Sequence, residues 1–144
     1  MPTYDTTFDV DATPAQIWET LTDFARYPEW NPQVVDASGS TEPGSEITLV
    51  LALSDGPNMT ITALIEESEL GRSLTWRGNG PRRWVFQGYR RFDIKATGNR
   101  SQVRHLEKIT GIAAPLFSLR MSRQAKQSHH ALNTALQHRA ANRH

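Results

Sequence analysis

Alternating apolar and polar positions open the chain and predict a half-buried first strand. Thr6, Phe8 and Val10 fall on one face of an extended chain, and aspartates lie between and beside them. Thr13 then has the chemistry of a helix N-cap, and Pro14 suits the first helical position. A stripe of apolar residues at helical spacing follows. The opening pattern therefore predicts a strand and then a short helix.

The next part of the chain shows a second short helix and then many short strands. We expect the helix over 23–27, broken by Pro28. Turn-forming pairs and triplets rich in Gly, Pro, Asn and Asp then separate strand-like runs, which predicts an antiparallel meander. The six predicted strands span 33–40, 45–53, 58–69, 73–79, 83–96 and 100–110.

A long helix is predicted from Pro115 to about Ala141. Its apolar stripe is weak in the middle, because Gln124 and Ser128 stand where a packed helix would carry Leu. Two explanations remain open: this face looks into a cavity, or the buried stripe is displaced by one residue. The stripe as we assign it contains Leu116, Phe117, Met121, Ala125, Leu132, Ala135 and Leu136.

The order of these elements indicates an α+β fold with one seven-stranded antiparallel sheet and two short helices between strands one and two. A twisted antiparallel sheet curls, and one long C-terminal helix fills its concave face only partly. We therefore expect a pocket inside. At 144 residues the chain fits a single domain over 1–144.

The amino-acid composition excludes several kinds of functional site. The chain has no cysteine, which excludes disulfides, thiol catalysis and Cys-ligated metals, and we expect no cofactor and no metal. The first residues do not look like a signal peptide, and no run is apolar enough to span a bilayer, so we expect a cytoplasmic protein without stable membrane insertion. Residues 1–70 carry a net charge of −12 and residues 71–144 carry +13. We expect the two halves to pair within the fold.

A family resemblance runs along nearly the whole chain. It begins in the segment 8–32, which contains Tyr27-Pro28-Glu29-Trp30-Asn31-Pro32, and continues at Pro43-Gly44, at 70–78 and at 88–111. These segments resemble the SRPBCC superfamily, which includes polyketide cyclase/dehydrase-like proteins, START lipid-transfer domains and birch-pollen-allergen-like proteins. The resemblance implies a helix-grip fold, in which the curved sheet wraps around the C-terminal helix and encloses a hydrophobic cavity. Members bind lipids, sterols, polyketides or plant hormones, and some catalyse cyclisation or dehydration.

Three polar residues are predicted to point inward from the last two strands. Arg90 shares a face with apolar residues of the sixth strand, and His105 and Glu107 do so on the seventh. With a tight turn at Gly98, one register places Arg90 opposite Glu107 and Phe92 opposite His105, and a shift by two residues would change these partners. Since an inward carboxylate needs a partner, we predict an Arg90–Glu107 pair.

This pair allows a structural and a functional interpretation. It can simply fix the strand register, or it can form the polar end of an apolar pocket in which Arg90 holds a ligand oxygen and His105 handles a proton. The favoured hypothesis is a protein that binds a small hydrophobic, lipid-like, aromatic or polyketide-like molecule. The alternatives are a cyclase or dehydratase with Arg90, His105 and Glu107 as catalytic residues, and a protein-interaction module. The candidate ligand-binding residues are Trp30, Met59, Ile61, Trp76, Trp84, Phe86, Phe92, Gln124 and Ser128.

Other features receive a plainer interpretation. Adjacent helical residues point about 100° apart, so His129 and His130 cannot chelate one metal, and we interpret them as surface histidines. The basic C-terminal helix lacks stacking aromatics, which argues against nucleic acid as a partner. The run 47–53 is apolar on both faces, which indicates either cover on both sides or an interface, for example in a homodimer.

Overall fold

The computed structural model describes residues 3–52, 57–79, 87–110 and 119–142, with side chains described from residue 123 onward in the last range. Its strands form one antiparallel sheet in the order β1-β7-β6-β5-β4-β3-β2. The strands are β1 (Thr3–Val10), β2 (Val34–Gly39), β3 (Glu46–Leu51), β4 (Met59–Glu69), β5 (Ser73–Asn79), β6 (Gln87–Thr97) and β7 (Arg100–Thr110). The helices are α1 (Pro14–Thr22), the 3-10 helix η1 (Phe24–Glu29) and α2 (Leu119–Ala141).

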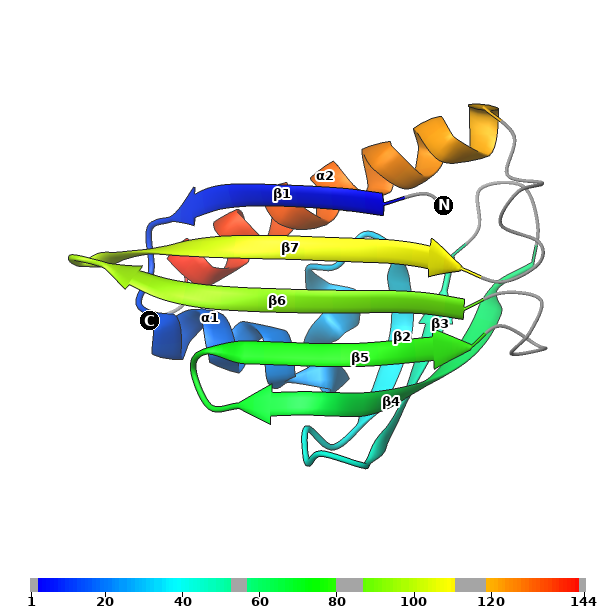
Figure 1. Cartoon of the computed structure of the whole chain (residues 1–144), viewed down its shortest axis with the longest axis horizontal. Helices are drawn as coiled ribbons and strands as arrows, with labels where there is room; N and C mark the ends of the chain where they lie inside the picture. The colour runs from blue at the N-terminus through cyan, green and yellow to red at the C-terminus, as the bar shows by residue number, and fades with distance from the viewer. Residues whose placement is uncertain (1–2, 53–56, 80–86, 111–118, 143–144) are drawn as a thin grey trace.

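The sheet is strongly curved, and the helices lie on its concave side. In Figure 1, β2 and β3 turn away from the plane of β5, β6 and β7, while α1 and α2 lie behind the sheet. β1, the first strand, pairs with β7, the last, so β1 and β2 form the two edges of the sheet. This is the predicted helix-grip architecture, and the predicted element order is confirmed.

Local sequence signals account for the start of the first helix. The Thr13 hydroxyl accepts a hydrogen bond from the backbone N–H of Gln16, and the Gln16 side chain accepts one from the Thr13 N–H. This reciprocal capping box satisfies two N–H groups that a helix start leaves without partners. Pro14 occupies the first turn, as predicted.

Two expectations about the helices need correction. The second short helix is η1, and it continues through Pro28 to Glu29 instead of ending there. In a helix this short, the missing proline N–H removes a single hydrogen bond. The interpretation of His129 as a surface residue is also wrong, because His129 is fully buried, whereas its neighbour His130 is exposed.

The buried face of α2 is displaced from the predicted stripe. It is centred on His129, Leu132, Asn133 and Leu136, and it ends at Ala140. Leu132 and Leu136 were assigned correctly, but the stripe also contains a histidine and an asparagine. Of the two explanations, the displaced stripe is therefore the one that fits the described part of α2. Pro115, Leu116 and Phe117 lie outside the described residues, and the side chain of Met121 is not described.

The apolar run of the third predicted strand is two-sided in the structure as well. Ile47 and Leu49 point into the core and are buried, while Thr48 and Val50 alternate with them and are half-buried. Leu53 lies outside the described residues. The run thus builds the inner face of β3, and the homodimer remains a prediction.

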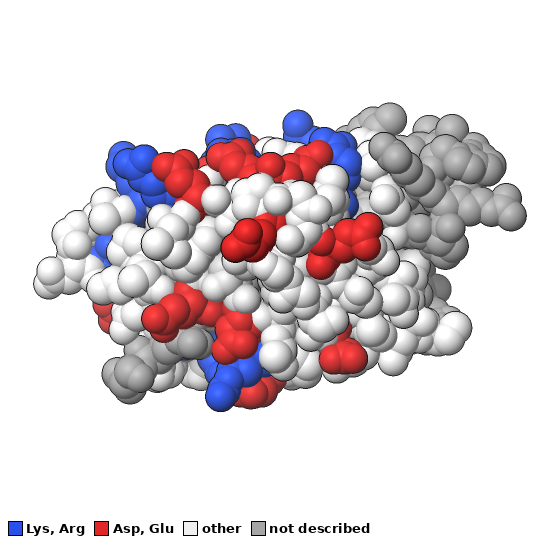
Figure 2. Space-filling model, turned by 90° about the horizontal axis from the view of Figure 1, so that it is seen from below, with Lys and Arg blue, Asp and Glu red and all other residues white. Residues whose placement is uncertain are grey.

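The acidic and basic halves of the chain meet at several seams of the fold. Arg104 on β7 binds Asp5 on β1 at 2.6 Å, as expected, and Arg77 on β5 binds Glu66 on β4 at 3.2 Å. The basic helix α2 also has a partner, because Arg139 binds Glu29 at 2.8 Å. Figure 2 shows acidic side chains spread over one face, with most of the visible basic side chains beside acidic ones.

Candidate functional site

Strands β6 and β7 bring the three predicted polar residues to the inner face of the sheet. The register pairs Arg90 with Glu107 and Phe92 with His105, which confirms both predicted partnerships. The turn at Gly98 makes this register possible, because its φ of +68° suits glycine and would strain most other residues. Arg90 Nη2 donates to Glu107 Oε2 at 2.6 Å, and both side chains are largely buried.

A pocket of about 120 Å³ opens beside this ion pair. Arg90 and Glu107 form part of its wall, and Asn31 and Gln33 add polar groups from the segment between η1 and β2. Most of the remaining wall is apolar, which suits a hydrophobic ligand with a polar end. The other described lining residues are Tyr27, Val34, Leu49, Leu51, Met59, Ile61, Trp76, Gly78, Gly88, Tyr89 and Ile109.

Two glycines keep space at the wall of this pocket. Gly78 on β5 pairs directly with Gly88 on β6. A Cβ at Gly78 would lie 2.8 Å from the Ile61 side chain, which is too close, whereas a Cβ at Gly88 meets no described atom within 4 Å. Gly88 stands two residues before Arg90 and so shares its face of the strand, but nothing in the sequence pattern singled it out as a pocket residue.

The candidate ligand-binding residues divide into three groups. Met59, Ile61 and Trp76 line the pocket. Trp30, Phe92, Gln124 and Ser128 are not among the described lining residues; Trp30 packs on Tyr27, and Phe92 stacks on His105. Trp84 and Phe86 lie outside the described residues.

The polar end of the pocket offers hydrogen-bond donors. Gln33 Oε1 accepts from Arg90 Nη1 at 3.3 Å, and Asn31 Oδ1 accepts from the Gln33 backbone N–H at 2.9 Å. Arginine has five N–H donors and no acceptor, so these contacts leave three N–H groups of Arg90 without a partner among the described residues. The side-chain NH₂ groups of Asn31 and Gln33 have no partner among the described residues either. This end of the pocket therefore suits a ligand that carries acceptor oxygens.

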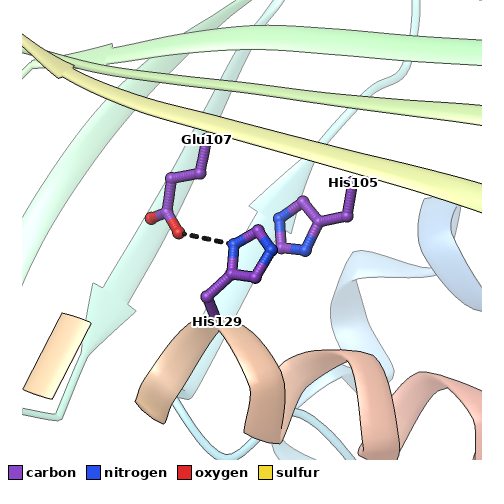
Figure 3. Close-up of side chains that lie close together, drawn as sticks. All are labelled: His105, Glu107 and His129. Atoms are coloured by element: carbon purple, nitrogen blue, oxygen red, sulfur yellow. Dashed lines mark hydrogen bonds and ion pairs between the residues drawn. The ribbon is translucent and has the colours of Figure 1, made fainter. Parts of the chain in front are cut away.

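Behind the pocket wall, a chain of hydrogen bonds connects β7, β1 and α2. His105 Nδ1 donates to Asn133 Oδ1 at 2.7 Å, and Asn133 Nδ2 donates to Thr6 Oγ1 at 2.8 Å. Thr6 Oγ1 lies 2.8 Å from His129 Nε2, and His129 Nδ1 donates to Glu107 Oε1 at 3.1 Å. Figure 3 shows His129 between Glu107 and His105. The helix thus fixes the carboxylate from the side opposite Arg90.

The electrostatics of the cluster follow from these contacts. Burial lowers the pKa of His105 to about 2, and the charge of Arg90 adds to this effect, so the ring is neutral at pH 7. Burial alone would raise the pKa of Glu107. The charge of Arg90 and the hydrogen bonds from His129 and Arg90 outweigh burial and hold that pKa at about 2, so Glu107 is ionised.

The geometry does not suit a metal ion, although His105, Glu107 and His129 offer ligand atoms within 4.8 Å of one another. An imidazole binds a metal in the plane of its own ring. The rings of His105 and His129 are stacked, with centroids 3.9 Å apart and planes only 7° from parallel, so their lone pairs cannot converge on one ion. His129 Nδ1 also carries the proton that it donates to Glu107.

Comparison with known proteins places this geometry in a family. The profile of the family described as polyketide cyclase/dehydrase and lipid transport matches residues 1–139. A search among curated proteins found no match. No helix in the described ranges is both long and apolar enough to cross a membrane.

Several solved structures share the fold. A START superfamily protein from Mycobacterium smegmatis superposes with a TM-score of 0.77 at 18% identity, over 96% of each chain. Ara h 8.0201 gives 0.75 at 11% identity, again over 96% of each chain. The di-domain aromatase/cyclase StfQ from the steffimycin biosynthetic pathway gives 0.72 at 12% identity, over 99% of this chain and 50% of that one. The chain therefore belongs to the polyketide cyclase/dehydrase and lipid transport family of the SRPBCC superfamily.

Proposed function

We propose that the protein binds a small hydrophobic molecule that carries an acceptor oxygen, with its apolar part in the pocket and its oxygen at Arg90. The observation that carries the proposal is the wall itself, which is apolar along β3, β4 and β5 and ends in a cluster of hydrogen-bond donors. A volume of about 120 Å³ suits a single ring, since an engineered cavity of about 150 Å³ binds benzene.

Acid–base catalysis is the second candidate, and the geometry supports it less well. Arg90 and Glu107 line the pocket, as an enzyme of the cyclase or dehydratase type would require, but His105 is not among the described lining residues. Both Glu107 oxygens accept hydrogen bonds, and a carboxylate with a pKa of about 2 is a weak base. A ligand carrier needs neither residue to move a proton.

Replacement of Gly88 tests the binding proposal. In Gly88→Leu the new side chain should occupy the pocket, so affinity for a single-ring ketone such as acetophenone should fall by at least about 10-fold, or about 1.4 kcal/mol. The fold should become more stable by roughly 0.5–1 kcal/mol, because glycine weakens a strand. Amide chemical shifts during an NMR titration measure the affinity, and urea unfolding measures the stability.

Two matched variants control this experiment. Gly88→Ala adds one methyl group and should retain most of the affinity. Thr62→Leu adds apolar volume at an exposed position of β4 and should leave the affinity unchanged. Binding that is equally strong in Gly88→Leu and in the unaltered protein would contradict the proposed pocket.

A further inference from the structure

The charges at the polar end of the pocket cancel each other. Arg90 and Glu107 both line the pocket, and their charged groups are 2.6 Å apart. The side chains are 15% and 16% exposed, so water screens them only weakly. A ligand at this end therefore meets donors of a cation and, directly beside them, a carboxylate.

Glu107 is held in the ionised state by contacts from two sides. Its Oε2 accepts from Arg90 and its Oε1 accepts from His129 Nδ1, so neither oxygen has reason to carry a proton. The resulting pKa of about 2 keeps the carboxylate charged at every pH at which the protein would normally be studied.

Behind this pair, polar side chains of β1, β7 and α2 form a connected set of hydrogen bonds. Thr6 Oγ1 accepts a hydrogen bond from Asn133 Nδ2 and lies 2.8 Å from His129 Nε2. His105 is neutral at pH 7, because burial lowers its pKa to about 2. Among the described residues that line the pocket, Arg90 is the only one with a cationic side chain.

We propose that Glu107 makes the pocket selective for uncharged carbonyl compounds over carboxylates, a proposal that rests on the proposed function. A ketone or ester oxygen accepts from the free N–H groups of Arg90, Gln33 or Asn31 and brings no charge. A carboxylate at the same place lies against the carboxylate of Glu107, whose presence already compensates Arg90. Glu107 is then a specificity-determining residue rather than a base.

Acetophenone and benzoate are suitable probes, because they share one ring and differ in the charge of the oxygen group. In NMR titrations at pH 7, the unaltered protein should bind acetophenone at least about 10-fold more tightly than benzoate, a difference of about 1.4 kcal/mol. Glu107→Gln leaves Arg90 uncompensated, so its affinity for benzoate should rise by at least about 10-fold and exceed its affinity for acetophenone.

Two further variants keep the test decisive. Glu107→Ala opens space in which the carboxylate of benzoate can replace the carboxylate of Glu107. Benzoate, and not acetophenone, should therefore raise the melting temperature of this variant, even if the variant folds poorly. The double variant Arg90→Gln/Glu107→Gln lacks both charges and should show no gain for benzoate. A gain in the double variant would overturn the role of the charge pair.

The remaining outcomes distinguish a failure of the proposed selectivity from a failure of the proposed function. Equal affinity of the unaltered protein for both probes, or no gain for benzoate in the two Glu107 variants while acetophenone still binds, overturns the selectivity and leaves the pocket intact. If neither probe shifts the signals of Met59, Ile61 or Trp76 in any variant, the proposed function itself fails, and the selectivity falls with it.

Discussion

His105 is a fully buried imidazole that the fold holds neutral. Its ring stacks between Phe92 and His129, its Nδ1–H is bonded to Asn133, and its Nε2 has no hydrogen-bond partner in the described structure. Protonation would place a charge in the core near Arg90. Folding must therefore exclude a proton that the unfolded chain binds below about pH 6.5.

This arrangement predicts how stability depends on pH. The pKa of His105 falls from 6.5 in the unfolded chain to about 2 in the fold, so the unfolded state binds more protons between these values and stability decreases as pH falls below about 6.5. His105 should contribute a slope of about 1.4 kcal/mol per pH unit over most of this range. Glu107, whose pKa falls from 4.5 to about 2, adds a loss of the same sign only below about pH 4.5.

Of these two groups, only His105 contributes to the slope of stability between pH 6 and pH 5. Urea unfolding in this range measures that slope. The variant His105→Gln should be less stable at pH 7 and should lose less stability per pH unit than the unaltered protein. His130→Gln, which changes an exposed histidine of α2, should keep the original slope. An unchanged slope in His105→Gln would contradict the neutral, buried state of the ring.

Residue-scale prediction from the sequence worked where alternation along a strand was decisive. The inward positions of Arg90, His105 and Glu107 follow from the period of two and from the turn at Gly98. The burial of His129 did not follow, because its partners Thr6 and Glu107 lie on other elements. A polar residue on a helix resembles a surface residue until long-range contacts identify its partners.

At the scale of elements, α1 shows a start that local chemistry alone specifies. Thr13, Pro14 and Gln16 form the cap, and the helix then buries Ile17 and Leu21 completely. The cap could be predicted because its residues are adjacent in sequence. The buried face of α2 could not, because it is set by the strands that it covers.

Removal of the cap gives a prediction for this element. Thr13→Ala should lower the free energy of unfolding by about 1 kcal/mol, because the backbone N–H of Gln16 at the helix start loses its acceptor, the Thr13 hydroxyl. Thr134→Ala replaces an exposed residue in the interior of α2 and should raise stability by up to about 0.7 kcal/mol through helix propensity. Urea unfolding of both variants checks the opposite signs. A loss in Thr134→Ala as large as in Thr13→Ala would contradict this assignment.

At the scale of the whole molecule, the fold brings oppositely charged parts of the chain together. Residues 1–70, with a net charge of −12, and residues 71–144, with +13, meet through contacts such as Asp5–Arg104, Glu66–Arg77 and Glu29–Arg139. These pairs are mostly exposed and each contributes little to stability. Arg90–Glu107 differs, because it is buried and lies at the wall of the pocket.

The fold was accessible from the sequence because its elements carry strong local signals and the strands follow in order. The pocket was less accessible. It is bounded by residues from η1 to β7, including the paired glycines Gly78 and Gly88, and the described residues of α2 do not line it. Its position depends on how far the sheet curls, which no local pattern encodes.

A crystal structure with 4-bromoacetophenone, located by the anomalous scattering of bromine, would show whether the pocket binds a carbonyl compound beside Arg90. We expect the ring against Ile61 and Trp76, and the carbonyl oxygen within about 2.7–3.2 Å of an N–H group of Arg90, Gln33 or Asn31. Bromine found only elsewhere, for example in the hollow between Trp18 and Leu70, or a carbonyl directed away from Arg90, would contradict the proposed binding site.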